Sequence, residues 1–194
     1  MKRVVLITAA LLAQAALFAQ AKWNVDPAHS SVKFTVKHLV ISEVEGSFKT
    51  FNGNMTSTKP DFVGSTIDFT VDVNSISTDN DKRDTHLKSD DFFNAEKFPK
   101  MTFKSTSFKK VSGKKYILTG NLTIRDVTKS VKFDVAYGGT AKDGQGNTKA
   151  GFKATTVINR FDYGLKWNAA TEAGGLVASS DVTIDLRLEL GQAK

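Results

Sequence analysis

The chain contains no cysteine, and residues that favour helices are scarce among its 194 residues. The lack of cysteine excludes a disulfide scaffold, thiol catalysis and thiolate metal sites, because each of these needs a sulfur atom. A domain of this size can bury enough apolar surface to be stable without disulfides. The composition also excludes a bundle of transmembrane helices, a coiled coil and a zinc-finger module.

Positively charged residues are only slightly in excess of negatively charged ones. There are 27 Lys and Arg against 20 Asp and Glu, which gives a formal net charge of +7. The surplus is small and scattered along the chain, so no nucleic-acid partner is predicted. The sequence also lacks GxSxG, GxGxxG and GxxxxGK[ST], so it has no nucleophile elbow and no nucleotide-binding loop.

The acidic and histidine residues do not have the spacing of a metal site. His29, His38 and His86 show neither HxH nor HExxH spacing. A calcium loop that started at Asp79 would place Asp84 where the sharp turn needs glycine. The sequence therefore predicts no metal, no cofactor and no catalytic residue.

The first 21 residues have the pattern of a secretory signal peptide. Lys2 and Arg3 form a positive start, an apolar stretch follows from Val4 to Phe18, and residues 19–21 supply the small-x-small cleavage pattern. A membrane anchor is the alternative, but this stretch is too short to span about 30 Å of hydrocarbon. We predict cleavage after Ala21, which leaves residues 22–194 as one exported domain.

Alternation of apolar and polar residues dominates the remaining chain. The final run is the clearest, because five aliphatic residues between 182 and 190 alternate with polar ones. A strand with one dry and one wet face is typical of an antiparallel sheet. The pattern predicts strands near residues 23–26, 30–38, 43–55, 65–76, 101–109, 115–125, 129–138, 149–159 and 180–190.

Two segments interrupt this alternation. Residues 79–98 are expected to hold one or two short helices and to cap one end of the domain, and residues 160–178 form a long connection. Long strands with one apolar face close into a barrel or stack as a sandwich, and alternation alone does not choose between them. The length of the strands favours a barrel of about eight strands, which can enclose one small ligand.

Phenylalanine is unusually frequent, with 14 residues against two tryptophans. The dry faces combine phenylalanine with glycine at Gly46, Gly53 and Gly120. This mixture suits a flat-walled apolar cavity, although a filled core can use the same residues.

Five segments of the chain carry specific signatures in a fixed order: WNVDPAHSSVKFTVKHLVISEVEGSFKTFNG (23–53), RDTHLKSDDFFNAEKFPKMTF (83–103), GNLTIRDVTKSVKF (120–133), INRFDYGLKWN (158–168) and SSDVTIDLRLEL (179–190). Together they resemble the YceI-like family of exported lipid-binding proteins. They cover almost all of the chain after residue 22, and one departure matters: Asp126 stands at a turn where the family usually has glycine. The resemblance implies an eight-stranded antiparallel, extended lipocalin-like barrel with a short helical insert. It also implies an elongated apolar pocket for polyisoprenoids or similar long-chain amphiphiles, with no established catalysis.

The ligand-binding residues predicted from both arguments are mostly aromatic. A polar head group would need hydrogen-bond donors, and Arg83, His86 and Arg160 are the candidates because they lie in the two irregular segments. Each of these could equally pair with a neighbouring acid: Asp84, Asp90 or Asp162. The residues expected to hold the apolar chain are Phe34, Phe48, Phe69, Leu118, Phe133 and Phe152, with Phe92, Phe93, Phe161 and Trp167 near the mouth.

The function predicted from the sequence is that of a periplasmic carrier. Its ligand would be an isoprenoid quinone, a quinone precursor, a fatty-acid derivative or a similar lipid, without stable insertion in a membrane. One alternative is an enzyme that acts on a lipid or quinone precursor inside the barrel, which would need an inward polar residue with a perturbed pKa. Another is an outer-membrane barrel, which would present its apolar face outward. The sequence leaves open whether the domain works alone or as a homodimer.

Removal of the leader has a direct test. We expect intact-mass measurement of the exported protein to give a chain that begins at Lys22, because the apolar stretch before it matches a cleaved signal. A purified protein that still begins at Met1 would contradict both the cleavage and the predicted compartment.

Overall fold

A computed structural model describes residues 20–169 and 176–194. The predicted leader lies outside this range except for its last two residues, so it stays a prediction. In the described part, no helix is long and apolar enough to cross a membrane. The strands are β1 (Ala21–Val25), β2 (Ser31–His38), β3 (Ser42–Phe48), β4 (Phe51–Ser57), β5 (Thr66–Asp72), β6 (Ile76–Ser77), β7 (Lys100–Ser112), β8 (Lys115–Ile124), β9 (Val127–Lys142), β10 (Thr148–Asn159) and β11 (Ala178–Gln192).

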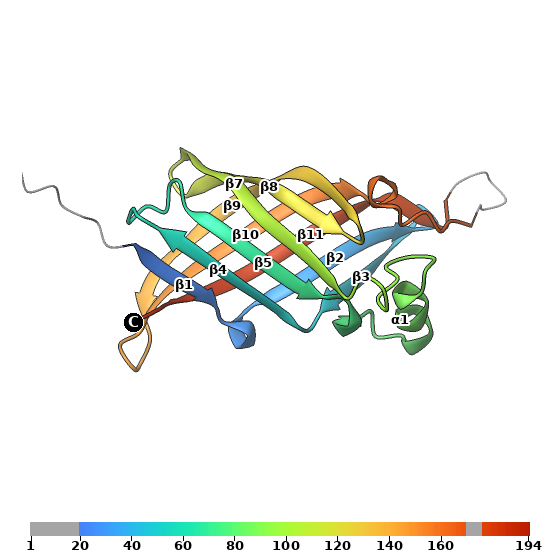
Figure 1. Cartoon of the computed structure of the whole chain (residues 1–194), viewed down its shortest axis with the longest axis horizontal. Helices are drawn as coiled ribbons and strands as arrows, with labels where there is room; N and C mark the ends of the chain where they lie inside the picture. The colour runs from blue at the N-terminus through green and yellow to red at the C-terminus, as the bar shows by residue number, and fades with distance from the viewer. Residues whose placement is uncertain (1–19, 170–175) are drawn as a thin grey trace, which may run out of the picture.

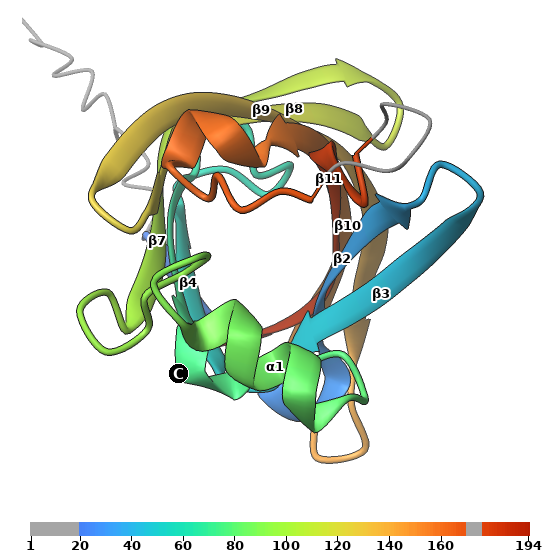
Figure 2. The same ribbon diagram turned by 90° about the vertical axis from the view of Figure 1, so that its right-hand side faces the viewer.

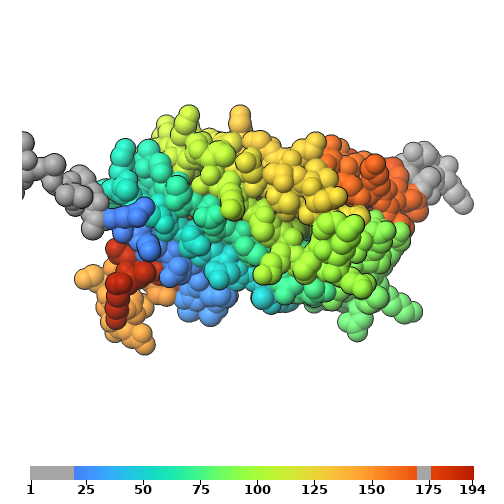
Figure 3. Space-filling model, in the orientation of Figure 1, coloured from blue at the N-terminus to red at the C-terminus, as the bar shows by residue number. Residues whose placement is uncertain are grey.

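The strands close into a barrel, which confirms the predicted fold class. Every pairing is antiparallel, and the order β1-β4-β5-β7-β8-β9-β10-β11 returns to β1. The long axis of the barrel lies horizontally in Figure 1, and its ring of strands is seen end-on in Figure 2. From the side, packed side chains form a continuous surface over the middle of the barrel (Figure 3). Closure removes the exposed edges that an open sheet would present.

Three of the eight barrel strands are broken into two pieces. Strand β2 continues β1 toward one end of the barrel, because β2 also pairs with β11. Strands β3 and β6 continue β4 and β5 in the same direction, because β3 pairs with β2 and with β6. The single strand predicted over 43–55 is therefore wrong at Lys49 and Thr50. Their backbone N–H groups donate to the carbonyl oxygen and hydroxyl of Ser75, both at 3.0 Å, instead of continuing a ladder. The 3₁₀ turn η1 (Pro27–His29) separates β1 from β2, and η2 (Val73–Ser75) separates β5 from β6.

Inward-facing phenylalanines lie flat over glycines on neighbouring strands. Phe34 is the register partner of Gly46, and Phe69 is the partner of Gly53. A Cβ added to Gly46 would lie 2.2 Å from Cζ of Phe34, and one added to Gly53 would lie 2.3 Å from Cδ2 of Phe69. The missing side chain lets each ring lie against the backbone, so the ring does not reach across the barrel. The flat aromatic wall expected from the sequence is present.

A cluster of aromatic rings fills the end of the barrel that carries the C-terminus. Phe62, from the connection between β4 and β5, has a positive φ of 61° and turns inward to 3% exposure. Its ring meets Trp23 and Phe152 at 5.3 Å between centroids. The Tyr116 hydroxyl donates to the backbone carbonyl of Asp61 at 3.0 Å and holds this connection in place. We call this cluster the aromatic plug; its members are Trp23, Phe62, Phe108, Tyr116, Tyr137 and Phe152.

The opposite end carries the helical insert, as predicted. Helix α1 (Asp81–Lys88) is capped at its N-terminus by Asn80, whose side chain accepts a hydrogen bond from the N–H of Arg83, and at its C-terminus by Ser89. It lies across one side of the barrel opening, facing η3 (Arg160–Tyr163) in Figure 2. The remainder of the insert forms turns, so the described segment holds one α-helix. Phe92 is 8% exposed, which shows that the insert is packed down onto the barrel.

The packing of rings over glycines predicts a specific sensitivity at Gly120. A Cβ there would lie 2.3 Å from Cζ of Phe103 and 2.5 Å from the carbonyl oxygen of Lys104. We expect Gly120→Ala to lower the free energy of unfolding by about 1–3 kcal/mol, because the backbone oxygen cannot move aside. Thermal or denaturant unfolding measures this loss. Gly144→Ala is the control, since Gly144 has open space around its Cα; equal stability of the two variants would contradict the argument.

Candidate functional site

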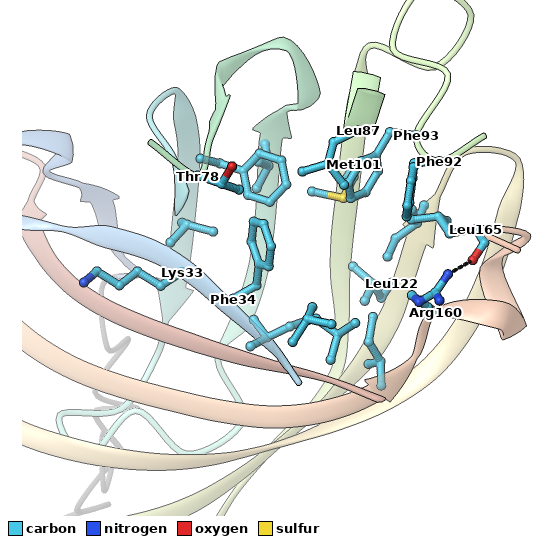
Figure 4. A pocket seen from close by; sticks show the side chains of 18 of the residues that line it. Lys33, Phe34, Thr78, Leu87, Phe92, Phe93, Met101, Leu122, Arg160 and Leu165 are labelled. Atoms are coloured by element: carbon cyan, nitrogen blue, oxygen red, sulfur yellow. Dashed lines mark hydrogen bonds between the residues drawn. The ribbon is translucent and has the colours of Figure 1, made fainter. Parts of the chain in front are cut away.

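The barrel encloses a cavity of about 530 Å³ between the aromatic plug and the helical insert. This volume falls within the range of roughly 300–1,000 Å³ that is typical of pockets for small molecules. Inward faces of the strands form most of the wall, and α1 and the segment after η3 complete it at the open end. Figure 4 shows Phe34, Met101 and Leu122 around this space.

Eight of the ten apolar residues predicted from the sequence line the cavity. The ring of Phe48 connects the barrel wall to the insert, because it lies 5.7 Å from Phe34 and 5.9 Å from Phe93. The aromatic surface is therefore continuous from mid-barrel to the mouth. The eight are Phe34, Phe48, Phe69, Phe92, Phe93, Leu118, Phe133 and Trp167.

The other two predicted apolar residues lie elsewhere, and both assignments are corrected. Phe152 packs in the aromatic plug against Phe62 and Tyr137, because its position near the start of β10 is at the filled end of the barrel. Phe161 does not reach the cavity, and its ring lies under the guanidinium of Arg160 at 4.4 Å. Alternation assigned the correct face of β10 but gave no position along the barrel axis.

Sequence reasoning missed a large part of the aliphatic wall. Alternation identifies the final strand, but none of its dry-face residues is among the predicted lining residues. The same signal on the other strands could have found the rest, except Leu87 in α1 and Leu165 after η3. The missed apolar lining residues include Val32, Val36, Val44, Ile67, Val71, Leu87, Met101, Phe103, Leu122, Ile124, Ile158, Leu165, Val182, Ile184, Leu186 and Leu188.

Arg160 is 4% exposed and holds the mouth together. Its guanidinium donates to four backbone carbonyls at 2.6–3.0 Å, and Figure 4 shows the bond to Leu165. Burial lowers the pKa of this guanidinium below its ordinary value, and no carboxylate of the described residues forms an ion pair with it. Four of its five N–H donors are therefore committed to structure. The carbonyls belong to Leu165, Trp167, Ala178 and Ser179.

Arg83 lines the cavity from the exposed first turns of α1. Its Nε donates to the Thr78 hydroxyl and its Nη2 to the Thr78 carbonyl, each at 2.7 Å. Asp84 does not form an ion pair with Arg83 but accepts from the N–H and hydroxyl of Thr78 at 2.9 and 2.6 Å. Within these described contacts, Arg83 keeps three N–H donors that make no hydrogen bond.

His86 lines the mouth one turn further along α1. Its Nε2 lies 2.8 Å from Oδ2 of Asp91, so the expected acidic neighbour is Asp91 and not Asp90. The imidazole ring also meets Phe92 at 5.1 Å and Trp167 at 5.2 Å, edge to face. His86 thus joins α1 to two of the aromatic residues that line the opening.

Carboxylates are missing from the cavity wall within the described ranges, 20–169 and 176–194. The one three-residue group there that could hold a metal lies elsewhere, where ligand atoms of Asp26, His29 and Glu189 come within 4.8 Å of one another. The Lys149 ammonium is 2.9 Å from Asp26 and 3.4 Å from Glu189, so it already supplies a positive charge there. Hydrogen bonds from Lys149 and His29 hold the pKa of Asp26 well below its usual range.

The fold and the cavity define a lipocalin-like barrel: closed, antiparallel, filled at one end and apolar inside. The YceI-like domain matches residues 23–190, and the chain belongs to the YceI-like family. A UPF0312 protein of Staphylococcus aureus is 39% identical over 165 residues, which cover 84% of this chain and 94% of that protein.

Two solved structures share both the fold and part of the sequence. The crystal structure of the Campylobacter jejuni YceI protein has 33% identity and a TM-score of 0.70, over 81% of this chain and 90% of that one. Burkholderia cenocepacia BcnA has 25% identity and a TM-score of 0.73, over 85% and 98% of the two chains.

The contacts of Arg160 predict a structural effect for its substitution. We expect Arg160→Met to lower the free energy of unfolding by at least about 2 kcal/mol, because four carbonyls lose a common donor. Hydrogen exchange is expected to rise first in residues 160–169. Arg187→Met is the control, since the Arg187 side chain is 67% exposed. If Arg160→Met unfolds like the control, Arg160 does not hold the mouth together.

Proposed function

We propose that this protein is a periplasmic carrier that binds a long-chain amphiphilic lipid, of the polyisoprenoid or fatty-acyl kind, in the apolar cavity. The observation that carries the proposal is the predominantly aromatic and aliphatic wall between the plug and the mouth. Each methylene group that such a wall buries contributes roughly 0.8 kcal/mol before ordering costs. A long chain can therefore bind tightly with few polar contacts.

A polyisoprenoid-binding domain from Saccharophagus degradans has the same fold, with a TM-score of 0.67, but only 16% identity. That likeness extends to the fold and not to the ligand. The ligand class proposed here rests on the cavity of this chain.

The head group is proposed to lie at the mouth beside Arg83. Of the three candidates, Arg160 is committed to backbone carbonyls and His86 is engaged by Asp91. Arg83 retains N–H donors at the rim, where a phosphate, carboxylate or amide oxygen can accept them. The role of the other two is to position the aromatic residues that surround the chain.

Binding is favoured over catalysis by the chemistry of the wall. General acid–base catalysis needs a titratable group of tuned pKa in contact with the substrate. Among the described lining residues, the pKa shift that is resolved belongs to Arg160, a group that cannot act as a base. The proposed compartment rests separately on the signal-peptide pattern of residues 1–21.

A single substitution inside the barrel tests the carrier function. We expect Phe69→Trp to weaken uptake of a fluorescent long-chain fatty-acid probe several-fold while the melting temperature stays nearly unchanged. Phe69 is only partly buried and lines the cavity, so the larger indole ring can occupy ligand space. Probe fluorescence and thermal unfolding are measured together on delipidated protein, because bound lipid stabilises the fold by mass action.

Phe108→Trp serves as the matched control. Phe108 is 3% exposed in the aromatic plug and stacks on Tyr116 at 4.9 Å. Added bulk there is expected to cost about 1–3 kcal/mol of stability and to leave probe affinity almost unchanged. If Phe69→Trp destabilised the protein without changing probe uptake, the interior would be a filled core and the carrier function would be wrong.

A further inference from the structure

The tip of the β2–β3 hairpin exposes three consecutive aliphatic side chains. Leu39, Val40 and Ile41 are 40%, 75% and 86% exposed. The other large exposed hydrophobic residues of the described chain, Val111 and Val157, are single residues on separate strands. Single exposed apolar residues are ordinary on a protein surface, whereas a contiguous exposed apolar group marks an interaction site.

The backbone of this tip is unfavourable for the residues that it carries. Leu39 has φ 51° and Val40 has φ 65°, and the N–H of Ile41 donates to the carbonyl of His38 at 3.2 Å. Two consecutive positive φ angles are the geometry of a turn that favours Asn-Gly, and β-branched residues there are rare. The hairpin thus displays apolar side chains at a position where polar residues would fold more easily.

The tip is attached directly to the mouth of the cavity. The N–H of Leu39 donates to the carbonyl of Val177 at 2.9 Å, and both Val177 and the adjacent His38 line the cavity. In Figure 2 the β2–β3 hairpin projects from the rim of the barrel at the end that carries α1. Exposed apolar side chains therefore lie next to the opening through which a ligand would enter.

We propose that this tip inserts into the surface of a lipid bilayer and docks the mouth there while the ligand is exchanged. The proposal rests on the carrier function, because a long-chain lipid resides in a bilayer and must leave it to enter the barrel. Three side chains are too few for a stable protein interface, which uses roughly 20–30 residues on each side. They are enough for shallow, reversible insertion, whose strength scales with the apolar area buried.

The charges on the two strands that lead to the tip favour apolar docking over electrostatic docking. Lys37 and Glu43 are register partners on the two strands that lead to the tip, so their charges offset each other. Docking driven by apolar insertion persists at high salt and on uncharged membranes, whereas docking by a basic patch is screened. Zwitterionic phosphatidylcholine vesicles are therefore a suitable probe.

The test compares the double variant Val40→Asn, Ile41→Asn with the wild-type protein. Asparagine tolerates positive φ, so the hairpin is expected to keep its fold. Co-flotation of ligand-free protein with phosphatidylcholine vesicles measures docking, and transfer of a pre-bound fluorescent fatty acid to the same vesicles measures exchange. We expect both to fall by roughly tenfold in the variant, because apolar area buried in the membrane is lost. Affinity for the probe in vesicle-free solution is expected to be unchanged.

The control double variant is Val111→Asn, Val157→Asn, which removes two exposed valines away from the tip. It is expected to dock and transfer like the wild type. Wild-type flotation and transfer rates in the tip variant, or an equal loss in the control, would overturn the proposal. The proposal would also be overturned if the wild-type protein were a dimer in solution and the tip variant a monomer, because the tip would then contact a second copy of the chain. Failure of the wild-type protein itself to bind the probe in vesicle-free solution is a different result, and it would refute the carrier function.

Discussion

The cavity depends on the way inward-facing phenylalanine rings lie against glycines of adjacent strands. A ring that stands upright on a strand would cross the narrow interior of an eight-stranded barrel and fill it. At Gly46, Gly53 and Gly120 there is no Cβ to hold the ring away from the backbone, so Phe34, Phe69 and Phe103 lie flat. The wall gains a large apolar area while the centre stays open.

The two ends of the barrel use aromatic residues for opposite purposes. At one end, Phe62 leaves a surface connection and enters the barrel, where it packs edge to face against rings from three strands. At the other end, Phe92 and Trp167 come from irregular segments and surround an opening. This asymmetry gives the cavity one direction of entry, and it places the exposed β2–β3 tip and Arg83 on the same side as that entry.

The buried charge of Arg160 shows why a positive residue near a pocket is not by itself a ligand contact. Planar guanidinium geometry lets one side chain satisfy several carbonyls that converge where a strand ends and an irregular segment begins. Those carbonyls would otherwise be buried without a donor, at a cost in free energy. Arg160 and Arg83 look alike in the sequence because both lie in irregular segments, and only their neighbours distinguish them.

Alternation along the sequence determined the all-β class, the dry face of each strand and the two irregular segments, because side-chain direction in a strand depends only on local backbone geometry. The length of the strands favoured a barrel, and the family signatures added its lipocalin-like form. Tertiary structure decided the rest: that Phe152 belongs to the plug, that the predicted strand over 43–55 breaks at Lys49 and Thr50, and that Arg160 donates to backbone carbonyls. These depend on how far each strand is shifted relative to its distant partners. That shift sets the height of a residue along the barrel axis, and no local pattern records it.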